Sequence, residues 1–272
     1  TAQRIKDIGV GYVGISLDGL KDVNDKFRGK EGAYEAAMRG IENCTAVGQR
    51  VGLRFTINHH NIMELDKIFD FIEEEGINRV CFYHLVYSGR GNAMMEEDVT
   101  AQESRSAMDT IIRRTRDFEE RGLEKEILTV DNHCDGVYIY LKTLREKGEA
   151  AAEHVWKHIS MNGGNRSGIA FGEVDPLGYV HPDQFTQHHT FGNVRERKFG
   201  EIWQDTSNAI MAGLKDRKPL LKGRCSSCRY LSCCNGNFRT RAEARTGDFW
   251  ASDPSCYLTD EEIGLAREEA AI

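Results

Sequence analysis

The sequence predicts an α/β protein in which a parallel sheet of strand–helix units is followed by a smaller, cysteine-rich α+β region. Extended apolar runs alternate with helical patterns in the first half of the chain, as in βαβ units. After about residue 163 the helical periodicity gives way to short strands and turns. Five of the eight cysteines fall in the 32 residues from 225 to 256. The two parts of the chain therefore differ in predicted secondary structure and in cysteine content.

The strands of the predicted sheet are apolar runs at residues 12–17, 51–58 and 79–86. Helical patterns occupy residues 33–47 and 62–75, and each of them stops at a glycine. This alternation predicts three parallel strands in chain order. Three such strands leave an edge of the sheet bare, so we interpret them as the second half of a barrel or doubly wound fold.

A capping box of Thr100 and Glu103 predicts the start of a long helix that runs to about Glu120 and ends before Gly122. Residues 129–130 are extended in this interpretation, and another helix is centred on residues 137–146. The sequence thus divides into three predicted domains, namely a partial barrel over 1–125, a helical connector over 126–160 and a cysteine-rich domain over 161–272.

Composition narrows the function to small-molecule or protein partners. The net charge of −7 argues against nucleic acid as the main partner, because phosphate binding needs a basic surface. No apolar run approaches the ~20 residues that cross a bilayer, so we expect no membrane partner. Clustered cysteines without a signal sequence indicate metal ligation in a reducing compartment, and we expect a cytoplasmic protein.

Four cysteines have the spacing of a metal site. Cys225-x2-Cys228-x5-Cys234 is followed by Cys256, and glycines flank the tight loop. Thiolates bind both zinc and iron–sulfur clusters. Only one CxxC pair is present where structural zinc sites usually have two, so the spacing favours a 4Fe-4S cluster and leaves zinc open. Cys233 cannot easily point to the same metal as its neighbour Cys234, and we leave it out.

Polar residues on the strands give a weaker signal. Arg54 and Asn58 share one face of their strand, and His84 alternates with apolar residues in the next. Burying such groups is costly unless they find partners, so a ligand with carboxylate or hydroxyl groups, or simply a solvated face, explains them. Ser16 closes the first strand at the end where α/β folds bind ligands. His181, close to Asp183, suits an acid–base pair, an axial ligand or a surface position.

These residues together resemble radical S-adenosylmethionine (SAM) enzymes that carry a C-terminal SPASM or twitch domain. YVGISLDG (12–19) followed by Arg28 is similar to the family's fourth-strand signature. The resemblance implies that Ser16 and Arg28 contact SAM. It also implies that Arg54 and Asn58 lie near SAM on the fifth strand and that Leu85 contacts its adenine. The fold it implies is the C-terminal half of a partial (β/α)6 radical SAM barrel, followed by a small α+β SPASM/twitch domain.

The closer resemblance is to the radical SAM proteins of modified-haem synthesis, in the haem d1 and alternative haem pathways (the NirJ- and AhbC-like subfamily). It is carried by FYHLVYSGRG (82–91), VDNHCDGVYIYLK (130–142), GYVHPDQF (178–185), FGNVRER (191–197) and DPSCYLTDEEIG (253–264). It implies radical removal of side chains from didecarboxysirohaem, with His181 and His84 as candidate contacts of the macrocycle. A ferredoxin or flavodoxin is the implied electron donor.

Two departures from the family pattern matter. Asp183 and Phe238 stand where many SPASM proteins have cysteines, which fits a single auxiliary 4Fe-4S cluster. The CxxxCxxC motif that binds the catalytic cluster is absent from this sequence. We therefore expect an N-terminally truncated enzyme, in which SAM and a second 4Fe-4S cluster belong to the full-length protein. The alternatives are a SPASM peptide maturase and a non-catalytic iron–sulfur or zinc electron-transfer module.

We predict that these 272 residues alone do not cleave SAM. Reductive cleavage needs a cluster with an open iron, which three ligands of a CxxxCxxC loop provide and a four-cysteine site does not. Reconstituted protein with dithionite and SAM should give no 5′-deoxyadenosine above a cluster-free blank. Turnover above that blank would mean that the cysteine-rich site has an open iron.

Overall fold

The computed structural model describes residues 1–265 and divides the chain into two compact units. The first unit holds residues 1–85 and 95–131, and the second holds residues 86–94 together with the chain from residue 132 onward. Each unit has its own sheet or helical core. No helix within residues 1–265 is long and apolar enough to cross a bilayer.

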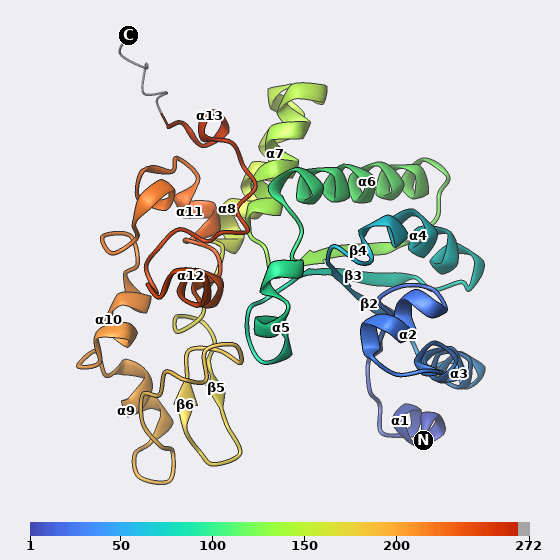
Figure 1. Ribbon diagram of the computed structural model, residues 1–272, viewed down its shortest axis with the longest axis horizontal. Coiled ribbons are helices and arrows are strands. Elements are labelled where there is room, and N and C mark those ends of the chain that lie inside the picture. Colours follow the sequence, from blue (N-terminus) through green and yellow to red (C-terminus); the bar gives the residue numbers. More distant parts are fainter. Residues whose placement is uncertain (266–272) are drawn as a thin grey trace. The chain divides into compact units, whose positions relative to one another are not determined.

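The first unit is built on a parallel sheet with the strand order β1-β2-β3-β4, of which Figure 1 labels β2, β3 and β4. The strands are β1 (Val13–Ser16), β2 (Val51–Ile57), β3 (Arg79–His84) and β4 (Glu126–Val130). The three strands predicted from the sequence are present, parallel and in the expected order. The expectation of only three was wrong. β4 pairs in parallel with β3, and β1 stays at the edge of the sheet among the described residues, as expected for the side where earlier strands would belong.

Helices of the first unit follow the predicted pattern closely. They are α1 (Ala2–Asp7), α2 (Asp22–Arg28), α3 (Ala33–Ala46), η1 (Ile62–Glu64), α4 (Leu65–Glu74), η2 (Met95–Glu97) and α6 (Ala101–Glu120). The capping box of α6 is formed, with the Glu103 amide donating to Thr100 Oγ1 at 3.2 Å. In return, the Thr100 amide donates to Glu103 Oε2 at 2.8 Å.

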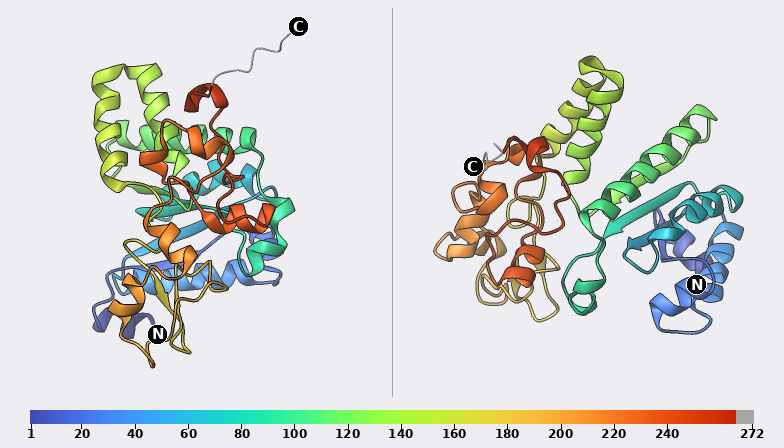
Figure 2. Two further views of the ribbon diagram at one scale, coloured as in Figure 1. Left: turned by 90° about the vertical axis from the view of Figure 1, so that its left-hand side faces the viewer. Right: turned by 45° about the horizontal axis from the view of Figure 1, so that its top comes forward.

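An aromatic core joins the sheet to two of its helices. The Phe82 ring on β3 lies 5.8 Å from Phe55 on β2 and 5.2 Å from Phe69 on α4. Phe69 in turn lies 5.8 Å from Phe118 on α6, and all four side chains are buried. Arg54 alternates with these apolar residues on β2 and is exposed. One face of the sheet is therefore packed under helices, which the ribbon views show beside the strands (Figure 2). The opposite face carries Arg54.

The second unit has little sheet and many short helices. Its longest are α7 (Cys134–Lys147) and α8 (Glu149–Asn162), which pack on each other and on α11 (Leu231–Cys234). α7 contains the predicted helix 137–146 and begins three residues earlier. The helices expected as a connector over 126–160 thus pack within this unit, and the predicted domain boundaries stay a prediction.

The remaining elements of the second unit are short. They are α5 (Arg90–Ala93), β5 (Glu173–Val174), β6 (Val180–His181), α9 (Phe199–Gln204), α10 (Ala209–Lys215), η3 (Gly223–Ser227), α12 (Arg239–Thr246) and α13 (Asp260–Ile263). β5 and β6 form a two-stranded antiparallel hairpin. Between these elements the backbone is irregular, so side chains must satisfy many of its polar groups.

We predict that Thr100→Ala lowers the free energy of unfolding of the first unit by about 1 kcal/mol, because it removes the N-cap of α6. Thr45→Ala is the matched control, since Thr45 is an exposed residue of the last turn of α3. That change should be neutral or slightly stabilising, because alanine is the better helix former. Urea unfolding followed by circular dichroism measures both, and equal effects would contradict a role for the cap.

Candidate metal centre

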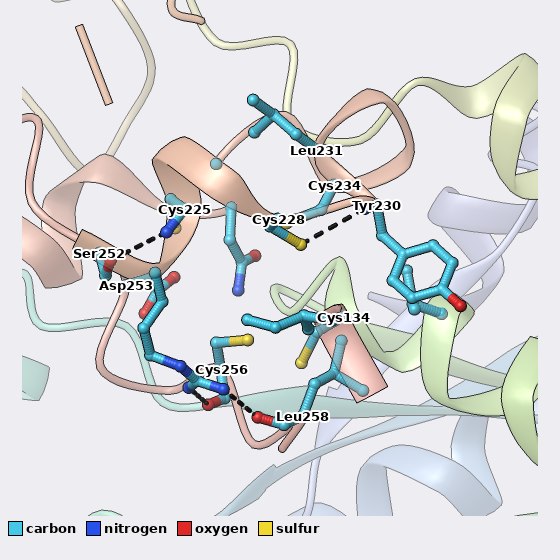
Figure 3. A pocket seen from close by; sticks show the side chains of 15 residues that line it. Cys134, Cys225, Cys228, Tyr230, Leu231, Cys234, Ser252, Asp253, Cys256 and Leu258 are labelled. Carbon is cyan, nitrogen blue, oxygen red and sulfur yellow. Dashed lines mark hydrogen bonds between the residues drawn. The ribbon is translucent and has the colours of Figure 1, made fainter. Parts of the chain in front are cut away.

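Five cysteines of the second unit line one cavity. The four predicted ligands Cys225, Cys228, Cys234 and Cys256 do so together with Cys134, which the spacing of the sequence did not indicate (Figure 3). They come from four segments of the chain: η3 and its end, the end of α11, the start of α7 and the loop before α13. The cavity is otherwise lined by apolar and neutral polar side chains, with Asp253 and Arg224 as its charged residues.

A short loop places the first two cysteines. Cys225 lies in η3, and its amide donates to Ser252 Oγ at 3.2 Å. Ser252 Oγ in turn donates to the Lys222 carbonyl at 2.9 Å, so the 222–225 segment is joined to the chain near residue 252. Cys228 ends the 3-10 turn, and its sulfur accepts from the Tyr230 amide at 3.4 Å. Such amide donors stabilise a thiolate.

Cys234 ends α11 and is followed by a backbone turn that few sequences allow. Asn235, Gly236 and Asn237 all have positive φ angles, of 53°, 75° and 58°. Asparagine and glycine are the residues that adopt this conformation most readily. Asn237 then contacts the start of α7, where its side chain accepts from the His133 amide at 2.9 Å and donates to Asn132 Oδ1 at 2.7 Å. The turn thereby holds Cys234 close to Cys134.

The opposite side of the Cys234 turn is packed against Gly164. A Cβ atom at this glycine would overlap the Cys234 carbonyl group, and its φ of +72° also disfavours other residues. Asn165 N donates to the Cys234 carbonyl at 3.1 Å. Residues after α8 therefore take part in positioning the cavity.

Cys256 is brought into the cavity by a buried ion pair. Arg241 and Asp253 have side chains that are 0% exposed, and Arg241 Nη2 lies 2.8 Å from Asp253 Oδ2. The same carboxylate accepts from the Phe238 amide at 2.9 Å and from the Ser255 amide at 2.9 Å. One carboxylate thus joins the chain just after Cys234 to the chain just before Cys256.

Cys134 was missed because the sequence places it in a separate helix, 91 residues before Cys225. In the structure it is fully buried at the start of α7, and its sulfur lies 3.0 Å from Asn132 Oδ1. Burial raises the pKa of the Cys134 thiol well above its usual value. A hydrogen bond from this thiol lowers the pKa of Cys256. We therefore assign Cys134 to a hydrogen-bonding position beside the predicted ligand set.

Burial also opposes ionisation of two predicted ligands. It raises the pKa of Cys234 well above its usual value, and it raises the pKa of Cys228. Arg224, whose guanidinium donates to the Cys256 carbonyl at 3.3 Å, lowers the pKa of both Cys228 and Cys256. Buried thiols of this kind become thiolates when a metal replaces their protons. The donor set thus fits a thiolate-bound metal group.

A single zinc ion and a four-iron cluster need different spacings of their thiolate ligands. A single zinc ion with Zn–S bonds of about 2.3 Å would need its tetrahedral thiolates about 3.8 Å apart. A four-iron cluster places each thiolate on a different iron and so needs wider spacing. Cys233, left out of the ligand set, lies away from the cavity with its sulfur 3.8 Å from Ser160 Oγ.

The other predicted site residues of the first unit lie near the carboxyl ends of its strands. Ser16 is exposed at the end of β1 and is opposite Arg54 in register. Arg54 Nη2 lies 3.5 Å from the Tyr12 hydroxyl. Arg28, at the end of α2, forms an ion pair with the fully buried Asp18. Burial raises the pKa of Asp18, and the Arg28 guanidinium opposes that shift.

Three more predicted site residues lie at the carboxyl ends of β2 and β3. Asn58 is fully buried, and its side chain donates to the Thr56 carbonyl at 3.0 Å and accepts from the His60 amide at 2.9 Å. This local turn gives Asn58 partners without a ligand. His84 is the last residue of β3 and Leu85 follows it, and both are buried.

His181 lies on β6 in the second unit and is 2% exposed. Its Nδ1 is 2.9 Å from the His189 carbonyl, and its Nε2 is 3.5 Å from Asp175 Oδ2. The sequence suggested Asp183 as the carboxylate beside His181. In the structure that carboxylate is Asp175. Asp183 instead accepts from the Thr186 hydroxyl at 2.9 Å and from the Phe185 amide at 2.9 Å, and so organises the following loop.

Comparison with known proteins adds three findings. The SPASM family, described as an iron-sulfur cluster-binding domain, matches residues 171–229, which include Cys225 and Cys228. The chain is 58% identical over 266 residues to Fe-coproporphyrin III synthase of Methanosarcina barkeri and 41% identical over 268 residues to pre-heme d1 synthase of Dinoroseobacter shibae. These alignments cover 97% and 98% of this chain but 66% of each relative.

Among solved structures, native anSMEcpe with bound AdoMet and the Cp18Cys peptide matches with a TM-score of 0.64. The sequence identity is 15%, over 94% of this chain and 67% of that chain. At that identity the likeness concerns the fold. It agrees with the parallel sheet and the cysteine-rich domain that the sequence predicted.

We predict that Cys228→Ala loses most of the cluster's visible absorption and iron after anaerobic reconstitution, because it removes one of four thiolate ligands. Cys134→Ala is the matched control, since Cys134 lines the same cavity but is assigned as a hydrogen-bond donor. It should keep its iron. Equal loss in both variants would assign Cys134 to the ligand set, and stoichiometric zinc without iron would overturn the cluster.

Proposed function

Since the chain belongs to the radical SAM proteins that carry a SPASM domain, we propose that the whole protein removes side chains from a modified tetrapyrrole. The proposed substrate is didecarboxysirohaem. The observation that carries the proposal is the 58% identity to Fe-coproporphyrin III synthase, which extends over 97% of this chain and includes both units. Because the chain spans 66% of that relative, the proposal concerns the full-length enzyme.

The first unit supplies the proposed SAM-binding edge. Ser16 ends β1 and lies opposite Arg54 of β2, and Asn58 directly follows β2. The three residues therefore lie toward the carboxyl end of the sheet. We assign Ser16 and Arg28 to SAM contacts, Arg54 and Asn58 to its polar surroundings and Leu85 to the adenine. Asp18 orients Arg28 through its ion pair and holds β2 through the Thr56 amide, which donates to Asp18 Oδ1 at 2.6 Å.

The second unit supplies the proposed auxiliary centre, with Cys225, Cys228, Cys234 and Cys256 holding one 4Fe-4S cluster. When bound, SAM with its own cluster supplies hydrogen abstraction from a propionate or acetate arm, and the auxiliary cluster supplies electron transfer or an anchor for the substrate. Of the chain's own residues, Cys134, Tyr230 and Leu258 line this centre with buried side chains. A ferredoxin or flavodoxin is the proposed electron donor.

His84 and His181 are the proposed contacts of the macrocycle. Their side chains are 4% and 2% exposed, so a contact requires neighbouring side chains to move. Neutral imidazole can ligate the iron of a metallated tetrapyrrole or transfer a proton at a propionate. Both roles need the ring nitrogens, of which His181 Nδ1 is engaged with the His189 carbonyl.

The direct test uses the full-length protein with its auxiliary cluster, SAM, a reductant and didecarboxysirohaem. We expect 5′-deoxyadenosine and tetrapyrroles lighter by the mass of the lost side chains, both measured by mass spectrometry. A peptide maturase shares this scaffold, as the peptide-bound structural neighbour illustrates. SAM cleavage that depends on a peptide and leaves the tetrapyrrole intact would replace the proposal with that alternative.

We predict that Arg28→Lys in the full-length enzyme raises the KM for SAM roughly tenfold while the enzyme still folds. Lysine keeps the charge that Asp18 requires but not the planar fork of donors. Arg39→Lys is the matched control, because Arg39 is an exposed residue of α3. Steady-state 5′-deoxyadenosine formation at varied SAM concentration measures both. An unchanged KM in Arg28→Lys would remove Arg28 from the SAM site.

A further inference from the structure

A second cluster of metal-ligand side chains lies in the cysteine-rich unit, apart from the cysteines. His188, His189 and Glu243 present ligand atoms that all lie within 4.8 Å of one another. His188 Nε2 is 2.8 Å from Glu243 Oε2, and His189 Nε2 is 2.9 Å from Glu243 Oε1. The histidines are 54 or more residues away from the glutamate in sequence. Tertiary structure therefore brings the three together.

The distances are short enough for the three side chains to share one ion after small movements. With ligand bonds of about 2.1 Å, a first-row divalent metal holds neighbouring donor atoms about 3.0 Å apart in octahedral geometry and about 3.4 Å apart in tetrahedral geometry. The nitrogen–oxygen distances here are 2.8, 2.9 and 3.1 Å. Two imidazoles and a carboxylate are a donor set that binds Fe²⁺ and Zn²⁺ and leaves further positions open for an added ligand.

The three ligands come from two segments, a loop that holds both histidines and the helix α12. Glu243 lies on α12, whose neighbouring Arg241 is anchored by Asp253. The His189 ring packs edge-on against Phe249 at 5.1 Å, and its carbonyl contacts His181. His188 is the most accessible ligand, with 55% of its side chain exposed, so an ion can reach the site from solvent.

A cavity of about 260 Å³ adjoins the site, lined by His188 and Glu243 and also by Thr240. Thr240 precedes Glu243 by three residues on α12, so both side chains point to the same side of the helix. Thr240 is 4% exposed, and its Oγ1 is buried without a hydrogen-bond partner among the described residues. Buried hydroxyls nearly always have a partner. A water or anion on a bound metal would supply one here.

We propose that His188, His189 and Glu243 bind a divalent first-row metal ion, Zn²⁺ or Fe²⁺, with its open position facing the Thr240 cavity. A hydrogen-bonded His–Glu–His cluster without metal accounts for the nitrogen–oxygen distances but leaves the Thr240 hydroxyl unexplained. The site is separate from the cysteine cavity, with which it shares no lining residue.

The test is equilibrium dialysis of the chain, with its cluster reconstituted, against Zn²⁺, followed by iron and zinc analysis. We expect one additional zinc per chain with the iron retained. The zinc X-ray absorption spectrum should contain nitrogen and oxygen ligands near about 2.0–2.1 Å and no sulfur shell near about 2.3 Å. A sulfur shell, or zinc gained only as iron is lost, would assign the metal to the cysteines and overturn the proposal.

Variants locate the ion. Glu243→Gln keeps the shape of the side chain, and His189→Ala removes one ligand; each should weaken zinc binding by roughly tenfold or more. His154→Ala is the matched control, because His154 is an exposed histidine of α8 in the same unit, and it should bind zinc as the parent does. The cluster's visible absorption verifies that each variant is folded. Equal zinc affinity in Glu243→Gln and the parent would contradict the site.

Discussion

The cysteine cavity depends on the buried ion pair between Arg241 and Asp253. Two charges in a dry interior are costly unless every donor and acceptor is matched. Here the carboxylate accepts from Arg241 and from two backbone amides, those of Phe238 and Ser255. These amides belong to the chain that follows Cys234 and the chain that precedes Cys256. Removing either charge would leave the other buried and release both cysteine segments.

Buried polar groups are matched elsewhere in the second unit as well. There, arginine side chains donate to backbone carbonyls that are not paired within a sheet or a helix. Arg217 is 2% exposed and donates to the Ser167 carbonyl at 2.5 Å and to the Asn235 carbonyl at 3.3 Å. Arg239 is buried too and donates to the carbonyls of Phe249 and Ala251. A loop-rich fold would otherwise bury unpaired carbonyls, so these guanidinium groups allow irregular backbone to surround a metal centre.

The first unit is stabilised in a different way, and this suits a different task. Its strands bury Phe55 and Phe82 against α4 and α6, while its polar face and strand ends carry Ser16, Arg28 and Arg54. An apolar core on one side of a parallel sheet leaves the carboxyl ends of the strands available for a ligand. A parallel sheet with an apolar core and a loop-rich region around a cysteine-lined cavity are thus combined in one chain.

The sequence by itself determined the elements whose signals are local. Period-two and period-3.6 patterns predicted β1–β3, α3, α4 and α6, and the spacing of Cys225, Cys228, Cys234 and Cys256 indicated one metal site. Long-range contacts decided the rest. β4 is a strand because β3 offers it an edge, and Cys134 joins the cavity because Asn237 holds the start of α7. His188, His189 and Glu243 meet only after the chain folds, since residues 54 and 55 positions apart have no local signal of proximity.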